Sequence, residues 1–203
     1  GFLGMSATLT PRPQLVSFIL LLMVTSAWLR TTRDLRPRWW LIPVSWLWAS
    51  SHGMWFSGVV VGAVVVVGLI LDGRIRGRRA LKLLAIPVSS LLVAAMTPVG
   101  PRLLLSPFAV GGITKYITEW ASPTIHDLSP AATALMIGVV ALTWARGRQV
   151  AWSNIVLLLL ATGWALLSAR TVTLGAAMTA PLMAGALQSL LHQRAPGISR
   201  LEV

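Results

Sequence analysis

Seven stretches of the chain are apolar and almost free of charge, and they limit the possible folds more than any other feature. They span Leu15–Leu29, Trp39–Ser51, Trp55–Leu71, Leu83–Met96, Ala131–Ala145, Ala151–Ser168 and Val172–Leu191. A helix needs about 20 mostly apolar residues to cross a bilayer, and none of the stretches alternates as a membrane β-strand does. The sequence therefore predicts an all-α, polytopic transmembrane bundle of about seven helices, with residues 1–203 forming a single domain.

The composition agrees with a membrane protein. Hydrophobic residues make up 56% of the 203 positions and charged residues only 11%, and the mean hydropathy is +0.77. Soluble domains carry about 25% charged residues, and disordered chains combine low hydrophobicity with high net charge. Both classes are therefore excluded. The chain has no cysteine, which excludes disulfides, thiolate metal sites and cysteine catalysis.

The basic residues follow an alternating pattern along the chain. Thirteen of the 17 lie in every second connector or after the last stretch, namely Arg30, Arg33, Arg36, Arg38, Arg74, Arg76, Arg78, Arg79, Lys82, Arg146, Arg148, Arg194 and Arg200. Short cytoplasmic loops are enriched in Lys and Arg. We therefore expect an N-terminus outside, a cytoplasmic C-terminus, and anionic lipid around the basic loops. Nucleic acid is not expected as a partner, because no element for stacking bases or reading grooves accompanies the net charge of +12.

The longest connector, residues 97–130, is expected on the outer face. Glycine and proline interrupt it, and Arg102–Leu105 and Ile113–Trp120 could form short interfacial helices between these breaks. Loops held by a rigid scaffold often carry function, although an ordinary solvated loop would look the same. Its candidate functional residues are Arg102, Lys115, Glu119, Trp120, His126 and Asp127.

Two further features stand at or inside the predicted helices. His52 ends the second stretch, and Gly58 and Gly62 lie one turn apart in the third, where they would let another helix approach closely. His52, Glu119, His126 and Asp127 do not follow a metal-binding spacing, so we expect neither a metal nor another cofactor.

Several short motifs occur in an order that resembles a known family. They are Arg12-Pro13-Gln14, the segment Trp48 to Gly53, Thr97-Pro98-Val99-Gly100 followed by Arg102 to Phe108, Glu119 to Pro123, and Ser168-Ala169-Arg170 before a helix with Pro181. This order resembles the C-terminal half of large bacterial membrane proteins related to GT-C glycosyltransferases. The resemblance covers about residues 12–181.

The resemblance implies transfer of a sugar from a polyprenyl-phosphate donor at the outer face of the bacterial cytoplasmic membrane. It implies that Arg12, Arg102, Lys115 and Arg170 bind the lipid phosphate, since guanidinium groups suit phosphate, and that Glu119 orients a hydroxyl or acts as a base. Such enzymes carry their catalytic carboxylate in a first outer loop. We therefore expect this chain to be part of a longer protein that supplies donor binding and a scaffold, and leave open whether it is an enzyme.

A second hypothesis is a non-catalytic membrane subunit. In that case Gly58 and Gly62 would pack against a partner membrane protein. Transport ranks below both hypotheses, because transporters usually keep ionisable residues within their spans and these stretches contain none away from their ends.

Overall fold

The computed structural model describes residues 14–106, 121–146 and 150–194, and these residues form helices and connectors without a strand. In chain order the elements are α2 (Gln14–Asp34), α3 (Leu41–Ser51), η2 (Gly53–Trp55), α4 (Phe56–Leu71), α5 (Gly77–Ala94), η3 (Gly100–Leu105), α7 (Leu128–Ala145), α8 (Trp152–Leu167) and α9 (Val172–Arg194), where η marks a 3-10 helix. The prediction of an all-α helix bundle is confirmed.

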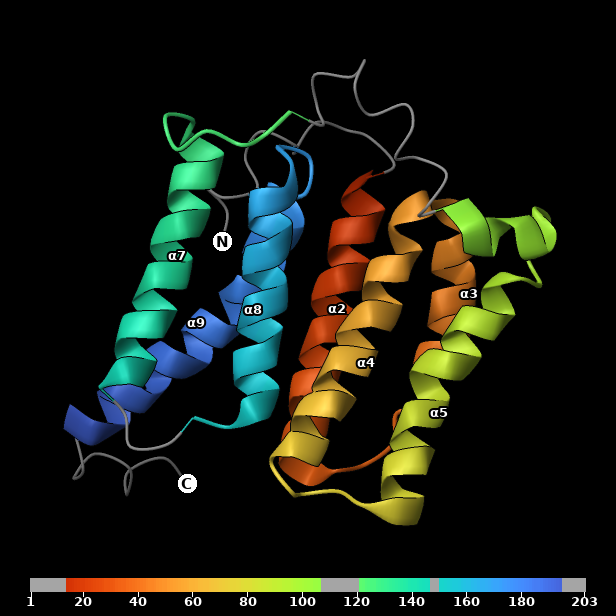
Figure 1. Ribbon diagram of the computed structural model, residues 1–203, viewed down its shortest axis with the longest axis horizontal. Helices are drawn as coiled ribbons and strands as arrows, with labels where there is room; N and C mark the ends of the chain where they lie inside the picture. Colours follow the sequence, from red (N-terminus) through yellow and green to blue (C-terminus); the bar gives the residue numbers. More distant parts are fainter. Residues whose placement is uncertain (1–13, 107–120, 147–149, 195–203) are drawn as a thin grey trace, which may run out of the picture.

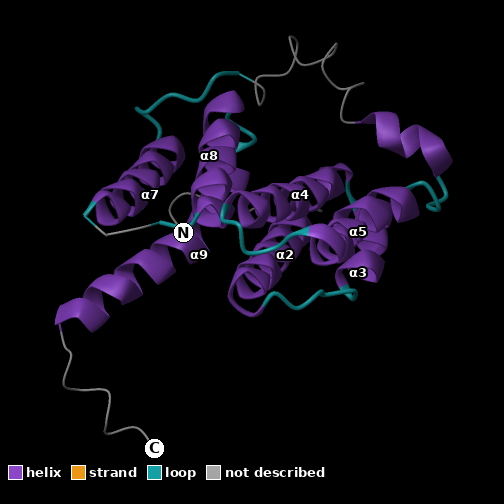
Figure 2. Cartoon of the chain, turned by 60° about the horizontal axis from the view of Figure 1, so that its bottom comes forward, coloured by secondary structure: helices purple, strands orange, loops and turns teal. Residues whose placement is uncertain are grey.

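The helices form two groups that lie side by side (Figures 1 and 2). One group contains α2, α3, α4 and α5, and the other contains α7, α8 and α9. The groups meet where α4 packs against α8, and α2 also contacts α9. The C-terminal half of α9 slants away from α8 in Figure 1.

Each of the seven α-helices in the described residues coincides with one of the apolar stretches, but α5 and α7 start several residues earlier than expected and α2 ends five residues later, at Asp34. α5 begins at Gly77 rather than Leu83, and therefore includes Arg78, Arg79 and Lys82. These residues end an apolar stretch but do not oppose helix formation, because Lys and Arg are good helix formers. α7 begins at Leu128 rather than Ala131. In the loop before it, η3 overlaps the expected interfacial segment Arg102–Leu105.

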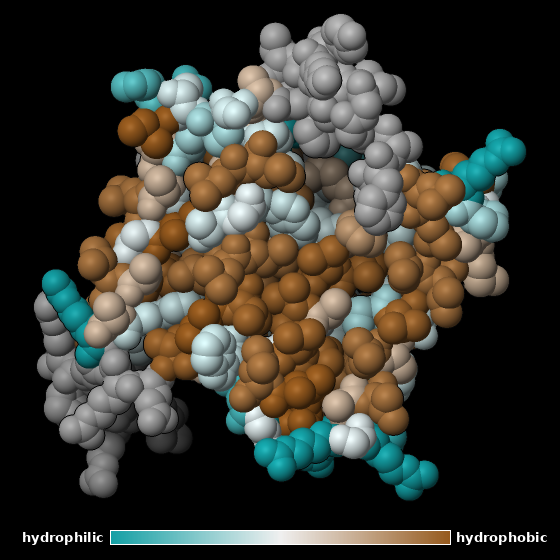
Figure 3. Space-filling view, viewed as in Figure 1, coloured by the Kyte–Doolittle hydropathy of each residue, from teal (hydrophilic) through white to brown (hydrophobic). Residues whose placement is uncertain are grey.

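Within the described ranges, four helical segments are long and apolar enough to cross a membrane. They are Leu15–Asp34, Gly53–Leu71, Leu128–Ala145 and Val172–Leu191, and the apolar α8 is slightly shorter. Apolar side chains cover the middle of the face in Figure 3, and hydrophilic ones lie near its edges. These features describe an integral membrane protein. α3 is shorter still: its 11 residues rise about 16 Å at 1.5 Å per residue, against a hydrocarbon thickness of about 30 Å.

Glycines allow close packing inside the bundle. A Cβ at Gly58 would lie 2.7 Å from the Trp48 ring, and one at Gly62 would lie 2.9 Å from the Trp28 ring. Both tryptophans are almost fully buried. Gly58 and Gly62 thus pack against rings of α3 and α2 in their own chain, so this helix face is not free for a partner protein.

The junction between the two groups has a tight contact and a polar bond. A Cβ at Gly68 of α4 would overlap the backbone of Ser153 in α8. One turn further, the Asp72 carboxylate accepts the backbone N–H of Trp152 at 2.6 Å and that of Ser153 at 3.2 Å. Because the first N–H groups of a helix have no partner within it, Asp72 supplies the cap that the sequence before α8 does not.

Candidate functional site

The two ends of the bundle, which Figure 1 shows at its top and bottom, differ in the number of basic residues that their connectors carry. One end, here called the arginine-rich end, has the α2–α3, α4–α5 and α7–α8 connectors and the end of α9. The opposite end has the α3–α4 and α8–α9 connectors, η3 and the start of α7. Charged groups are few there, and His52, Arg102, Arg170, His126 and Asp127 are its predicted site residues within the described part of the chain. Which side of the membrane each end faces stays a prediction.

His52 takes part in a hydrogen-bonded chain at this opposite end. The Trp48 indole N–H donates to Ser17 Oγ at 2.8 Å, and Ser17 Oγ lies 2.9 Å from His52 Nδ1. The backbone N–H of Met54 also donates to Nδ1, at 3.3 Å. Because this backbone donor needs a lone pair on Nδ1, the neutral ring carries its proton on Nε2. His52 is held by α2, α3 and η2 together, and Nε2–H is left as its remaining donor.

Arg170 lies close enough to His52 for its charge to act on the imidazole. Burial lowers the pKa of His52 below its ordinary value, and the positive charge of Arg170 lowers it further. Both effects disfavour the charged imidazolium, so the ring stays neutral near neutral pH. The structure therefore places two predicted site residues that are far apart in the sequence at the same end of the bundle, one after α3 and one before α9.

The turn that carries Arg170 is fixed by local hydrogen bonds. The backbone N–H of Ser168 donates to Thr171 Oγ1 at 3.0 Å. The backbone N–H of Ala169 donates to the carbonyl oxygen of Ala121 at 2.9 Å, and so ties the turn to the loop before α7. Arg170 is thus carried by a defined turn rather than by a free loop.

The other predicted site residues are more dispersed or lie outside the description. Arg102 is on η3, which packs on α5 and is separated from the α8–α9 turn in Figure 1. His126 is exposed, and Asp127 precedes α7 without a side-chain cap bond. Arg12, Lys115, Glu119 and Trp120 lie outside the described residues. In the described ranges, no group of three His, Asp or Glu side chains could hold a metal ion.

Two residues of structural importance were not found from the sequence. Ser17 is fully buried and joins Trp48 to His52, but it stands in an apolar stretch where a single serine attracts no notice. Asp72 looked like an ordinary connector residue. Its only signal was a carboxylate in a connector otherwise rich in arginine.

No protein family, curated protein or solved structure matches the chain in the comparisons. The functional argument therefore rests on its own residues.

Proposed function

We propose that the chain is the membrane module of a GT-C-like transferase and binds a polyprenyl-phosphate-linked sugar at the end of the bundle that carries His52 and Arg170. In this proposal the module supplies donor binding and a scaffold. The membrane is the bacterial cytoplasmic membrane, with the arginine-rich end in the cytoplasm, as the distribution of basic residues favours.

The placement of His52 and Arg170 at the same end of the bundle, where the charge of Arg170 acts on the imidazole, is the observation that carries the proposal. A guanidinium group can donate two parallel hydrogen bonds to a phosphate, and a neutral imidazole offers one more donor from Nε2. Both residues lie at helix ends, where a lipid headgroup is expected. The low number of other charges at this end leaves little competition for an anion.

The remaining predicted residues have more limited parts in the proposal. Arg102 would reach the headgroup region from η3, and Arg12 and Lys115 would add positive charge. Glu119 would orient a sugar or acceptor hydroxyl, because a carboxylate can accept a hydrogen bond from it or act as a general base.

A non-catalytic membrane subunit is the second candidate, and the exposure of α7 favours it. Leu135 and Leu142 of this helix are 69% and 63% exposed, so one face of α7 is covered by lipid or by another membrane protein. Gly58 and Gly62 do not provide such a surface, since they are buried against the chain's own tryptophans.

Binding of undecaprenyl phosphate to the purified chain tests the first proposal. Arg170→Ala should weaken binding about tenfold or more, because a charge-assisted hydrogen bond contributes about 1.5–3 kcal/mol and about 1.4 kcal/mol corresponds to a factor of ten. Arg170→Lys should restore only part of the affinity, since an ammonium group cannot form the bidentate pair.

His52→Gln removes the imidazole donor, and Arg76→Ala at the arginine-rich end is the charge-matched control. Thermal unfolding of each variant would show that it is folded. Equal affinity of Arg170→Ala, Arg76→Ala and the unchanged chain would refute a donor site at His52 and Arg170. A longer protein that still transfers sugar normally with Glu119→Gln would refute the role of that carboxylate.

A further inference from the structure

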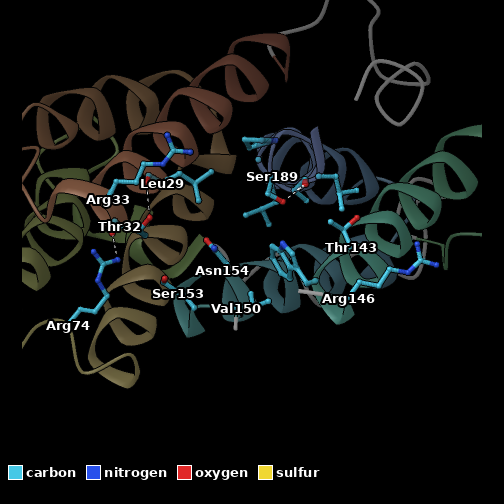
Figure 4. Close-up of a pocket in the computed structure, with 17 residues that line it drawn as sticks. Leu29, Thr32, Arg33, Arg74, Thr143, Arg146, Val150, Ser153, Asn154 and Ser189 are labelled. Carbon is cyan, nitrogen blue, oxygen red and sulfur yellow. Dashed lines mark hydrogen bonds between the residues drawn. The ribbon is translucent and has the colours of Figure 1, made fainter. Parts of the chain in front are cut away.

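A cavity of about 750 Å³ lies in the arginine-rich half of the bundle, between α2, α7, α8 and α9 (Figure 4). It is separate from the His52–Arg170 pair, which lies at the opposite end. Its lining is partly polar and partly apolar; the apolar part is formed by Leu29, Trp144, Pro181, Leu182 and Ala186, and the small residues Gly185 and Ser189 widen the cavity along α9.

The length of the cavity matches the depth of one lipid leaflet. Its lining on α9 extends from Pro181 to Leu190, which corresponds to about 13 Å along the helix axis. Half of the hydrocarbon thickness is about 15 Å. A molecule with a polar head at the helix ends could therefore place an apolar chain along this part of α9.

Among the described residues, three arginines line the cavity and no carboxylate does. Figure 4 shows Arg33 and Arg74 on one side of it and Arg146 on the other. Arg74 donates to the carbonyl oxygen of Thr32, whereas Arg33 and Arg146 make no side-chain hydrogen bond or ion pair with another described residue.

The nearest acidic groups already have partners. Asp34 pairs with Arg38 at 2.9 Å, and Asp72 caps α8 through the N–H groups of Trp152 and Ser153. The arginines around the cavity are thus a positive charge that no carboxylate of its lining balances, and this is complementary to an anionic headgroup.

An unpaired hydroxyl group also lines the cavity. Ser153 is 1% exposed, and its Oγ has no hydrogen-bond partner within the part of the chain that the structure describes. This hydroxyl is closed off from the cavity space, whereas the neighbouring Asn154 lines the same cavity and is partly exposed, so its amide can donate to a headgroup oxygen.

We propose that this cavity binds one anionic glycerophospholipid, with its phosphate on the side of Arg33 and Arg74 and one acyl chain lying along α9 from Leu190 toward Pro181. Arg33 and Arg74 attract the phosphate, the partly exposed Asn154 offers a hydrogen bond to its oxygens, and the apolar residues along α9 contact the acyl chain. The site is independent of the proposed donor site, so either can fail without the other.

Binding of phosphatidylglycerol to the full chain in neutral detergent, followed by native mass spectrometry, tests the inference. Phosphatidylcholine and water-soluble glycerol phosphate are the comparison ligands. We expect phosphatidylglycerol to bind at least tenfold more tightly than either. Arg33→Ala should reduce its affinity about tenfold, as expected for a lost charge-assisted bond, whereas Arg146→Ala, on the far side of the cavity, should reduce it less. The matched control is Arg30→Ala, which removes an arginine from the same end that does not line the cavity.

A second pair of variants tests the apolar part. Gly185→Leu adds a side chain at a position where nothing lies within 4 Å of a new Cβ, and Gly163→Leu does the same in α8 away from the cavity. Only Gly185→Leu should abolish phosphatidylglycerol binding. The inference is overturned if Arg30→Ala weakens binding as much as Arg33→Ala, if Gly185→Leu leaves binding intact, or if glycerol phosphate or phosphatidylcholine binds as well as phosphatidylglycerol.

Discussion

Removing the Asp72 carboxylate should loosen the junction between the two helix groups. Asp72→Ala deletes both hydrogen bonds to the start of α8. Loss of an N-cap side chain costs about 0.5–2 kcal/mol, and loss of a negative charge near a helix N-terminus costs about 0.3–1 kcal/mol. Since Asp72 is partly exposed, we expect the free energy of unfolding to fall by about 2 kcal/mol in total.

Asp72→Asn should have about half of this effect. An amide oxygen can still accept one of the two N–H groups, but the charge is lost. The free energies would be measured by titrating the chain in neutral detergent with a denaturing detergent and following helix content.

Asp127→Ala is the matched control, because Asp127 also precedes a helix but makes no side-chain cap bond. It should change the free energy of unfolding by less than about 0.5 kcal/mol, as is usual for surface substitutions. The reasoning would be refuted if Asp72→Ala were as stable as the unchanged chain, or if the Asp127 variant lost as much stability as the Asp72 variant.

Three further predictions concern packing, pH and topology. Gly68→Ala should lower the free energy of unfolding by about 1–3 kcal/mol, because the new Cβ would overlap the backbone of α8. Gly138→Ala, where nothing lies within 4 Å of a new Cβ, should be neutral or stabilising by up to about 1 kcal/mol. Equal effects of the two substitutions in the same assay would contradict this. The free energy of unfolding should decline as the pH falls below about 6.5, because the lowered pKa of His52 means that the unfolded chain binds the proton first. Unfolding measured at pH 5 and at pH 7.5 should show a smaller decline in His52→Gln than in the unchanged chain. An identical decline in both would exclude His52 as the cause. Cysteines in Ser122→Cys and Arg76→Cys should react with an impermeant reagent from opposite sides of intact cells, with the first outside, and labelling of both from one side would disprove the predicted topology.

The helices could be predicted because apolar length is a local property of the sequence. Each α-helix lies on a charge-poor stretch, and the short loops between them were clear. The apolar stretch predicts a start at Leu83, whereas α5 begins at Gly77 and includes Arg78, Arg79 and Lys82. Basic residues at a membrane boundary can continue a helix, because Lys and Arg are good helix formers. Charge marks the edge of the bilayer more directly than it marks the end of a helix.

The site could be predicted only in part, because its contacts join distant parts of the chain. The sequence singled out His52 and Arg170 separately, but their proximity depends on how α2, α3 and α9 pack. Similarly, the spacing of Gly58 and Gly62 indicated a close approach without indicating that the neighbours would be tryptophan rings of the same chain. The cavity between four helices arises from their relative tilts, which no local pattern encodes.

The short α3 has a consequence for the membrane around the protein. A helix of about 16 Å covers little more than half of the hydrocarbon layer, so lipids beside it must compress, or their headgroups must be drawn inward, to avoid exposing acyl chains to water. The protein would then carry a locally thinned patch of bilayer along one flank. In a cell with membranes of unequal thickness, that distortion costs least in the thinnest one, and acyl-chain length becomes a determinant of where the protein accumulates.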